Sequence, residues 1–114
     1  MAFVTLGNTV SVSAGPTVTV ANIQTTTNTF RVLNANATGY SYAGVYSTYA
    51  DALVAHHPTT GDAAGASSVG IAPTQSETIV GNFGPNAIAG TVYVAVITGA
   101  SSGQLVQITP VRPV

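Results

Sequence analysis

The 114-residue chain has no cysteine, no lysine and no tryptophan. Without cysteine it forms neither a disulfide framework nor a thiolate centre. Charged residues make up 4% of the chain, whereas an ordinary soluble domain carries about 25%. The only fixed positive charges belong to Arg31 and Arg112, and two guanidinium groups cannot neutralise a row of phosphates. We therefore expect no nucleic-acid partner.

Long hydrophobic runs are also missing. The longest, VYVAVI at 92–97, is far shorter than the roughly 20 residues of a membrane-spanning helix. The first ten residues, MAFVTLGNTV, lack the basic start and the extended apolar stretch of a secretion signal. We therefore expect neither a membrane partner nor a secretion signal.

Neutral polar side chains replace charge. The chain has 17 threonines, 9 serines and 7 asparagines beside 46% hydrophobic residues. Valine alternates with threonine in regular runs, which indicates ordered strands rather than disorder. Low charge removes the repulsion between proteins and lowers the cost of desolvating one surface against another. The composition therefore favours a protein that works inside an assembly.

Alternating apolar and polar residues predict several short strands. TVSVSAGPTVTV, residues 9–20, predicts a hairpin around an Ala-Gly-Pro turn, with its valines on the buried faces. The segment 91–98 is the most apolar strand, and we expect it at the centre of its sheet. Further strands are expected at 29–35, 40–47, 69–72 and 104–110. APTQSETIV, residues 72–80, predicts a proline-started turn that leads into another strand, with Glu77 facing outward. The asparagine-rich NANATG, residues 34–39, is expected to form a turn.

Seven or eight short strands with frequent turns indicate an all-β fold, an antiparallel β-sandwich of jelly-roll or immunoglobulin-like order. One domain spans residues 1–114, with at most one short helix near 48–55 that Pro58 closes. Arg31 is expected to pair with Glu77 or Asp51 and so to fix the strand register.

Three segments outside the expected strands are candidates for contacts with a partner. They are an arm at 1–7, a long loop at 48–68 and an extended C-terminal tail at 109–114. We expect Pro110 and Pro113 to take the tail out of the sheet, because proline cannot donate to a strand ladder.

The stretch DALVAHHPTTGD, residues 51–62, holds both histidines and two of the three carboxylates. A zinc site without cysteine would need both His56 and His57, but adjacent side chains in an extended segment point to opposite sides. We therefore expect no metal and no cofactor. The histidines are interpreted as loop residues that form contacts.

Catalytic arrangements are equally weak. The chain has no G-x-S-x-G elbow for a serine hydrolase. Nothing places two of Asp51, Asp62 and Glu77 at the separation that glycoside cleavage requires. The glycine-rich loops lie between strands and lack the lysine of a phosphate-binding loop. We expect neither an enzyme nor a small-molecule substrate.

Tyrosines concentrate in YSYAGVYS, residues 40–47, where Tyr40, Tyr42 and Tyr46 share one face of the expected strand. One interpretation is an ordinary strand whose rings pack while the phenol groups reach solvent. The other is an interface, because tyrosine is enriched where proteins meet.

In order along the chain, FRVLNANATGYSYAGV, IAPTQSETI and VYVAVITGASSGQLVQITPV resemble a group of small structural proteins of tailed bacteriophages. The resemblance covers roughly residues 29–110. The chain differs from that group in having Thr74 where the turn usually carries glycine, and in the extra segment 48–68. The resemblance implies a virion protein that decorates or cements the head shell.

We therefore predict a bacteriophage capsid cement or decoration protein at the surface of the virion head, assembled in the host cytoplasm. Its expected partners are the major capsid protein and further copies of itself, as a dimer or trimer. The alternatives are a receptor- or glycan-binding module of a head or tail fibre, and a tail or connector component. The residues expected at interfaces are Phe3, Val4, Leu6, Tyr40, Tyr42, Tyr46, Tyr49, His56, His57, Arg112 and Val114.

Overall fold

The computed structural model describes residues 3–25, 27–37, 39–54, 68–81, 90–98 and 104–113. In this part of the chain nine strands form two antiparallel sheets with one short helix. The predicted all-β sandwich is confirmed. The strand count exceeds the expected seven or eight.

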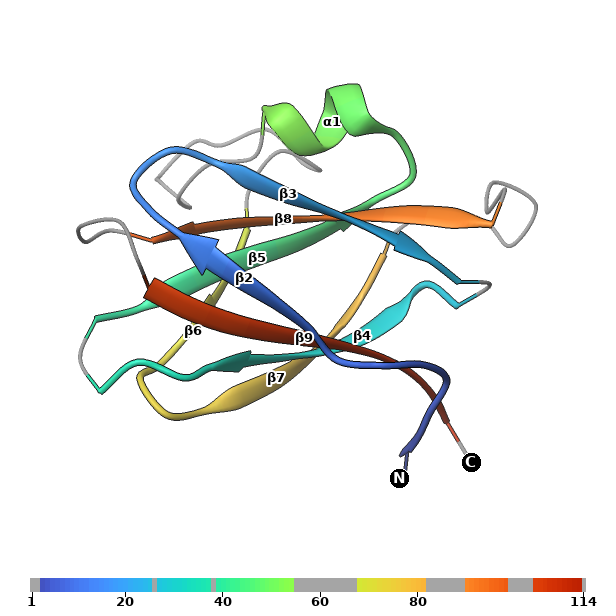
Figure 1. The fold of residues 1–114 in the computed structure, drawn as a ribbon, viewed down its shortest axis with the longest axis horizontal. Coiled ribbons are helices and arrows are strands. Elements are labelled where there is room, and N and C mark those ends of the chain that lie inside the picture. The colour runs from blue at the N-terminus through green and yellow to red at the C-terminus, as the bar shows by residue number, and fades with distance from the viewer. Residues whose placement is uncertain are drawn as a thin grey trace.

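One sheet, called sheet A here, has the order β1-β9-β4-β7, and β2 also pairs with β9 on the side of β1. Its strands are β1 (Phe3–Thr5), β2 (Val10–Ala14), β4 (Thr29–Asn34), β7 (Ser76–Val80) and β9 (Gln104–Pro113). Figure 1 shows β7 at the lower margin of the molecule, and the N- and C-terminal ends close together.

The other sheet, sheet B, has the order β3-β8-β5-β6. Its strands are β3 (Thr19–Gln24), β5 (Ser41–Tyr46), β6 (Val69–Ile71) and β8 (Thr91–Thr98). The helix α1 (Tyr49–Leu53) lies on the outside of this sheet, at the top of Figure 1.

The pairing of the strands defines a jelly roll. β2 pairs with β9, β3 with β8, β4 with β7 and β5 with β6, all antiparallel. The chain therefore forms a long ribbon in which the strands β2 to β5 run beside β9 to β6, and this ribbon wraps around one core. Of the two predicted strand orders, the structure has the jelly roll.

The core lies between the two sheets and consists of every second residue of their strands. Phe30 and Val32 from β4 face Val92, Val94 and Val96 from β8, and none of these side chains is exposed. β8 is an inner strand of sheet B, as predicted. Because α1 covers part of its outer face, β8 is buried on both sides, which explains its nearly continuous apolar sequence.

The predicted hairpin at 9–20 is wrong. β2 belongs to sheet A and β3 to sheet B, so the segment between them crosses from one sheet to the other. The backbone N–H of Thr98 donates to the carbonyl of Gly15 at the start of this crossing. Val12 is buried in the core, but Val18 and Val20 lie on the outside of sheet B, half-buried against the cluster beneath α1.

The tail does not leave the sheet as predicted, and the described part of the expected arm also contains a strand. β9 continues to Pro113, and β1 pairs with its end: Phe3 lies opposite Pro113, and Thr5 lies opposite Val111. The arm and the tail thus form part of sheet A.

Pro110 fits inside β9 because its nitrogen faces a gap between strands. The N–H of Leu6 donates to the carbonyl of Pro110 at 2.9 Å, and the nitrogen and carbonyl of one strand residue point to the same side. The nitrogen therefore points to residues 6–9, where β1 has ended and β2 has not begun. No ladder bond is lost there.

Pro113 is tolerated for a similar reason on the other side of β9. The hydroxyl of Thr27 donates to the carbonyl of Val111 at 2.7 Å, so the backbone groups of residues 111 and 113 point toward the side of β4. β4 begins at Thr29, opposite Val111, and the nitrogen of Pro113 lies beyond its end. No strand needs a donor at that place.

The helix α1 confirms the expected short helix but ends earlier than predicted. The hydroxyl of Thr48 caps it by accepting from the N–H of Asp51 at 3.2 Å, and the last helical residue is Leu53 rather than residue 55. Ala52 is its buried residue. Residues 55–67, which include both histidines, lie outside the described residues.

Candidate interaction surfaces

Tyr40 and Tyr42 form an exposed aromatic pair at one end of the sandwich. Their rings stack with centroids 6.4 Å apart, and Tyr40 is 53% exposed while Tyr42 is half-buried. Asn34, a fully buried residue of β4, donates to the carbonyl of Gly39 at 3.0 Å. Gly39 has a φ of 85°, which favours glycine, and this turn presents Tyr40 to solvent.

Tyr46 does not belong to the exposed file of tyrosines that the sequence predicted. Its side chain is 8% exposed and packs with Ala52 of α1 and Ala95 of β8. The alternation of side chains between the two faces of the strand was predicted correctly, but α1 covers this part of the outer face of sheet B. Tyr46 is therefore not available to a partner on the described surface.

The phenol of Tyr46 lies in an unusual environment. Burial raises its pKa above the ordinary value, the Ser68 hydroxyl opposes this shift, and the Asp51 carboxylate adds to it. The Tyr46 and Ser68 hydroxyls are both buried without a hydrogen bond of acceptable geometry. The Tyr46 ring itself packs against Ala52 and Ala95.

Gly44→Ala tests the packing of this ring. A Cβ at position 44 would lie 2.6 Å from the Tyr46 hydroxyl and 2.8 Å from its ring. The ring is confined beneath α1, so we expect the free energy of unfolding to fall by about 1–3 kcal/mol, measured by urea denaturation. In the control Gly70→Ala, the Cβ meets the half-buried ring of Tyr42 at 3.2 Å, and that ring can yield. An equal loss in both variants would contradict this account.

The outer side of α1 forms a second surface, the α1 patch, consisting of Tyr49, Leu53 and Val54. These residues are 53%, 46% and 62% exposed. The ring of Tyr49 also makes an edge contact with Tyr93 of β8, with centroids 5.9 Å apart. Three large apolar side chains thus lie exposed on a short helix and its C-cap residue, Val54.

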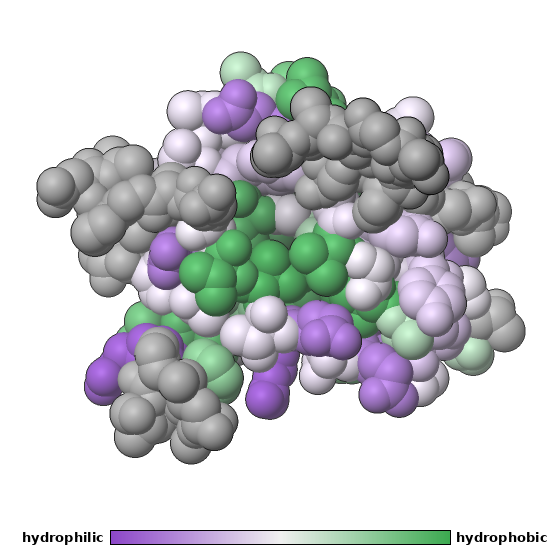
Figure 2. All heavy atoms as spheres, turned by 180° about the vertical axis from the view of Figure 1, so that it is seen from behind, coloured by the Kyte–Doolittle hydropathy of each residue, from purple (hydrophilic) through white to green (hydrophobic). Residues whose placement is uncertain are grey.

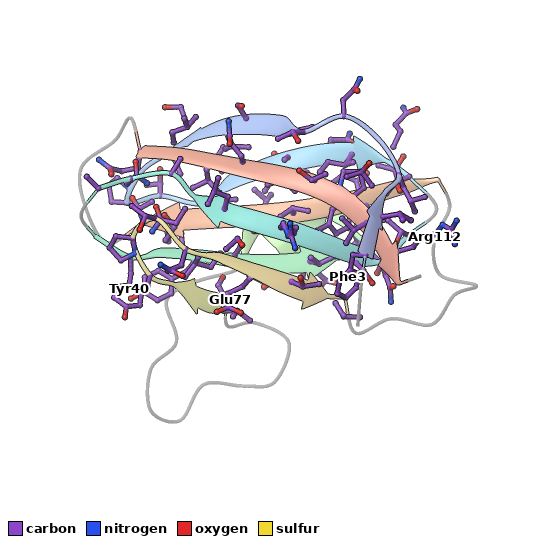
Figure 3. All side chains as sticks on the ribbon, turned by 90° about the horizontal axis from the view of Figure 1, so that it is seen from below. Phe3, Tyr40, Glu77 and Arg112 are labelled. Atoms are coloured by element: carbon purple, nitrogen blue, oxygen red, sulfur yellow. The ribbon has the colours of Figure 1, made fainter. Side chains whose placement is uncertain are left out.

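The third surface, the terminal surface, consists of Phe3, Val4, Leu6 and Arg112 around the pairing of β1 with the end of β9. Phe3 is half-buried, and the other three are exposed. Figure 3 places Phe3 and Arg112 at one end of the molecule and Tyr40 at the other. Apart from the buried Tyr46, the predicted interface residues that the structure describes therefore lie on three separate surfaces. His56, His57 and Val114 lie outside the described residues.

The expected ion pair of Arg31 is not formed. Arg31 lies opposite Thr78, whereas Glu77 lies opposite the core residue Val32, so the two charged side chains are on opposite faces of sheet A. Asp51 is on α1, outside the other sheet. Arg31, Asp51, Glu77 and Arg112 are all exposed, and strand register is fixed by apolar burial instead.

Apolar side chains reach the surface in other places as well. Val69 lies opposite the core residue Ala43, yet it is 49% exposed at the edge of sheet B, and Val80 of β7 is 60% exposed. Figure 2 shows a continuous apolar area at the centre of the back face, bordered by weakly and strongly polar residues. The surface thus combines apolar areas with neutral polar groups.

Within the described ranges, no three histidine or acidic side chains gather into a possible metal site. No described helix has the length and apolar character needed to cross a membrane. His56, His57 and Asp62 fall outside these ranges, so their interpretation as loop residues stays a prediction.

The sequence did not predict the structural positions of two residues, Asn34 and Glu77. Asn34 joins β4 to Gly39 and to β6, and it looked like one of several asparagines in a turn. Glu77 was expected to face outward, but its register places it on the inner side of the edge strand β7. Asn34 lies two residues after Val32 and four after Phe30, on the same side of β4. This alternation could have indicated that Asn34 is buried.

Comparison with known proteins adds no relative: no family model, curated protein or solved structure matches the chain significantly. The fold therefore rests on the strand pairing itself. The resemblance to bacteriophage structural proteins stays a prediction.

Proposed function

We propose that this protein is a bacteriophage capsid cement or decoration protein, which binds the outer surface of the major capsid shell and stabilises the head. The observation that carries the proposal is a β-sandwich whose surface has very little charge and three separate areas with exposed apolar side chains. Such areas on a soluble domain mark contacts with other proteins. Jelly rolls occur in viral capsid domains, which supports the same function.

The mechanism is stabilisation by repetition. Each copy contributes weakly charged contacts whose desolvation costs little. Copies that also associate with each other, as a dimer or trimer, bind neighbouring capsid proteins with the advantage of multivalency. Repeated over the lattice, modest contacts resist the outward pressure of packaged DNA. The protein would act at the head surface after assembly in the host cytoplasm.

The α1 patch is the part of the surface proposed to bind the shell. The double variant Leu53→Ser and Val54→Ser removes two exposed apolar side chains from it without touching the core. Added to heads that lack the protein, the native chain should raise the temperature at which they release DNA. The double variant should lose most of this effect.

Leu105→Ser is the matched control, because Leu105 is 41% exposed on the outer face of sheet A, away from α1. It should stabilise the heads as the native chain does. If native chain leaves the release temperature unchanged, the proposed function is wrong. If both variants act alike, the shell-binding role of the α1 patch is wrong.

A second candidate function is recognition of a receptor or glycan by a fibre. The stacked and exposed pair Tyr40 and Tyr42 favours it, since sugars stack on aromatic rings, and jelly rolls also occur in lectins. Saturable binding on a glycan array, abolished by Tyr40→Ala, would support this function over cementing. A tail or connector component is the remaining alternative.

A further inference from the structure

β7 is an edge strand whose free side has a regular set of backbone groups. The N–H of Asn34 donates to the carbonyl of Gln75, and the N–H of Gly81 donates to the carbonyl of Asn28. The odd-numbered residues of this segment therefore bond to β4, and the backbone groups of Ser76, Thr78 and Val80 point away from the sheet. Within the described chain, no strand pairs with this side of β7.

We propose that two copies of this chain associate through β7, antiparallel, about a two-fold axis at Thr78. In this register Thr78 lies opposite its own copy, and Ser76 lies opposite Val80 of the second chain. The outward N–H and carbonyl groups of Ser76, Thr78 and Val80 then pair with those of Val80, Thr78 and Ser76 in the second copy. The edge is self-complementary, as a two-fold axis requires. The two A sheets become one continuous sheet.

The properties of β7 favour this edge over the others. Ser76, Glu77, Thr78 and Val80 are exposed, and the strand SETIV contains no proline, glycine or lysine. β6 has only three residues, and the edge formed by β1 and β2 is interrupted between them. β3 has the cluster beneath α1 on its outer face and lies beside β2. An added strand meets the fewest obstacles at β7.

Glu77 keeps this association weak and reversible. Its side chain lies on the inner side of the sheet, opposite Val32, although it is exposed at the edge. A charge that points inward on an edge strand is a known protection against edge-to-edge pairing. In the proposed dimer the two Glu77 residues are diagonal neighbours, with their Cα atoms about 7–8 Å apart, and their carboxylates repel each other.

This arrangement has a role in a protein with so few charges. A net charge of −1 provides almost no general repulsion between copies. One carboxylate at the exposed edge therefore limits association in free solution. On a shell, where neighbours are held close together, the effective concentration would overcome this limit.

The test is sedimentation equilibrium of the isolated full chain. The native protein should show a monomer–dimer equilibrium, and Glu77→Gln should tighten it by about threefold to tenfold because the repulsion is removed. Thr78→Pro deletes an N–H that points away from β4, so it should weaken the dimer about tenfold or more without breaking the ladder of sheet A. Asn22→Pro is the matched control. The N–H of Thr25 donates to the carbonyl of Gly90 on the β8 side, and backbone groups alternate along the strand, so the N–H of Asn22 points away from β8. This substitution therefore changes the free edge of β3, which the proposed dimer does not use.

Thr78→Lys guards against misfolding of the proline variant. It leaves the backbone intact but places two ammonium groups opposite each other, and should also weaken the dimer. A monomer for both native protein and Glu77→Gln would overturn the proposal. So would a dimer that Thr78→Pro and Thr78→Lys leave unchanged.

The inference rests on the self-association in the proposed function, but the two can fail separately. The sedimentation experiment contains no capsid shell. A β7 dimer that does not bind heads would contradict the cement function only. Heads stabilised by a chain that never pairs through β7 would contradict the inference only.

Discussion

Asn34→Ala is expected to lower the free energy of unfolding by about 3 kcal/mol or more. Asn34 is fully buried, and its amide donates to the carbonyls of Gly39 and Ile71, both at 3.0 Å. Its carbonyl oxygen accepts from the backbone and side-chain nitrogens of Asn36 at 3.2 and 2.7 Å. Alanine leaves these groups without partners and creates a cavity between β4 and β6.

Urea denaturation measures this loss, with Asn22→Ala as a control. Asn22 is exposed on β3, and its substitution should change stability by less than about 0.5 kcal/mol. Asn34→Ala should also loosen the turn that presents Tyr40, which tyrosine fluorescence would report. A cost below about 1 kcal/mol would mean that the network does not join β4 to β6 as described.

Phe30→Ala should cost about 3–5 kcal/mol, because it removes the largest fully buried side chain among the described residues. Phe30 lies between Ile79 on β7 and Pro110 on β9, so the cavity would open in the core, against the middle of sheet A. A domain of this size has a total stability of about 5–15 kcal/mol. The variant should therefore unfold at a much lower urea concentration.

Arg31→Ala is the neighbouring control, since the Arg31 side chain is exposed on the other face of the same strand. It should shift the unfolding midpoint little. Equal effects of the two substitutions would contradict the register assigned to β4. That register also determines the outward groups of β7, so this comparison bears on the proposed dimer.

The individual strands could be predicted because burial imposes a period of two. Phe30 and Val32 alternate with exposed Arg31, and the continuous run in 92–97 reflects a strand covered on both faces. The partners of the strands could not be predicted this way. A hairpin and a crossing between sheets both bury alternate valines, so 9–20 fits either, and the jelly-roll order became clear only from the pairing.

The candidate surfaces were predicted in part. Val4, Leu6, Tyr40, Tyr49 and Arg112 are exposed, and their role at an interface stays a prediction. Tyr46 has the same strand parity as Tyr42, but a short helix contributed by the following segment covers it. Coverage of one element by another depends on tertiary structure, and a local pattern does not contain it.

Proline marks a second limit of local rules. Pro110 and Pro113 were expected to end the sheet, but each directs its nitrogen to a side where no neighbouring strand needs a donor. Which side a residue's backbone faces depends on register, and register depends on distant partners. The same geometry identifies Ser76, Thr78 and Val80 as the free groups of β7.

The cement function is tested most directly by counting bound copies. Purified chain is mixed with emptied heads of the corresponding phage and sedimented through a density gradient, and the copies bound per shell are measured. The account predicts saturation at a simple ratio to the major capsid protein, as lattice-wide contacts require. No binding, or only a handful of copies per particle, would contradict it and favour a recognition or connector role.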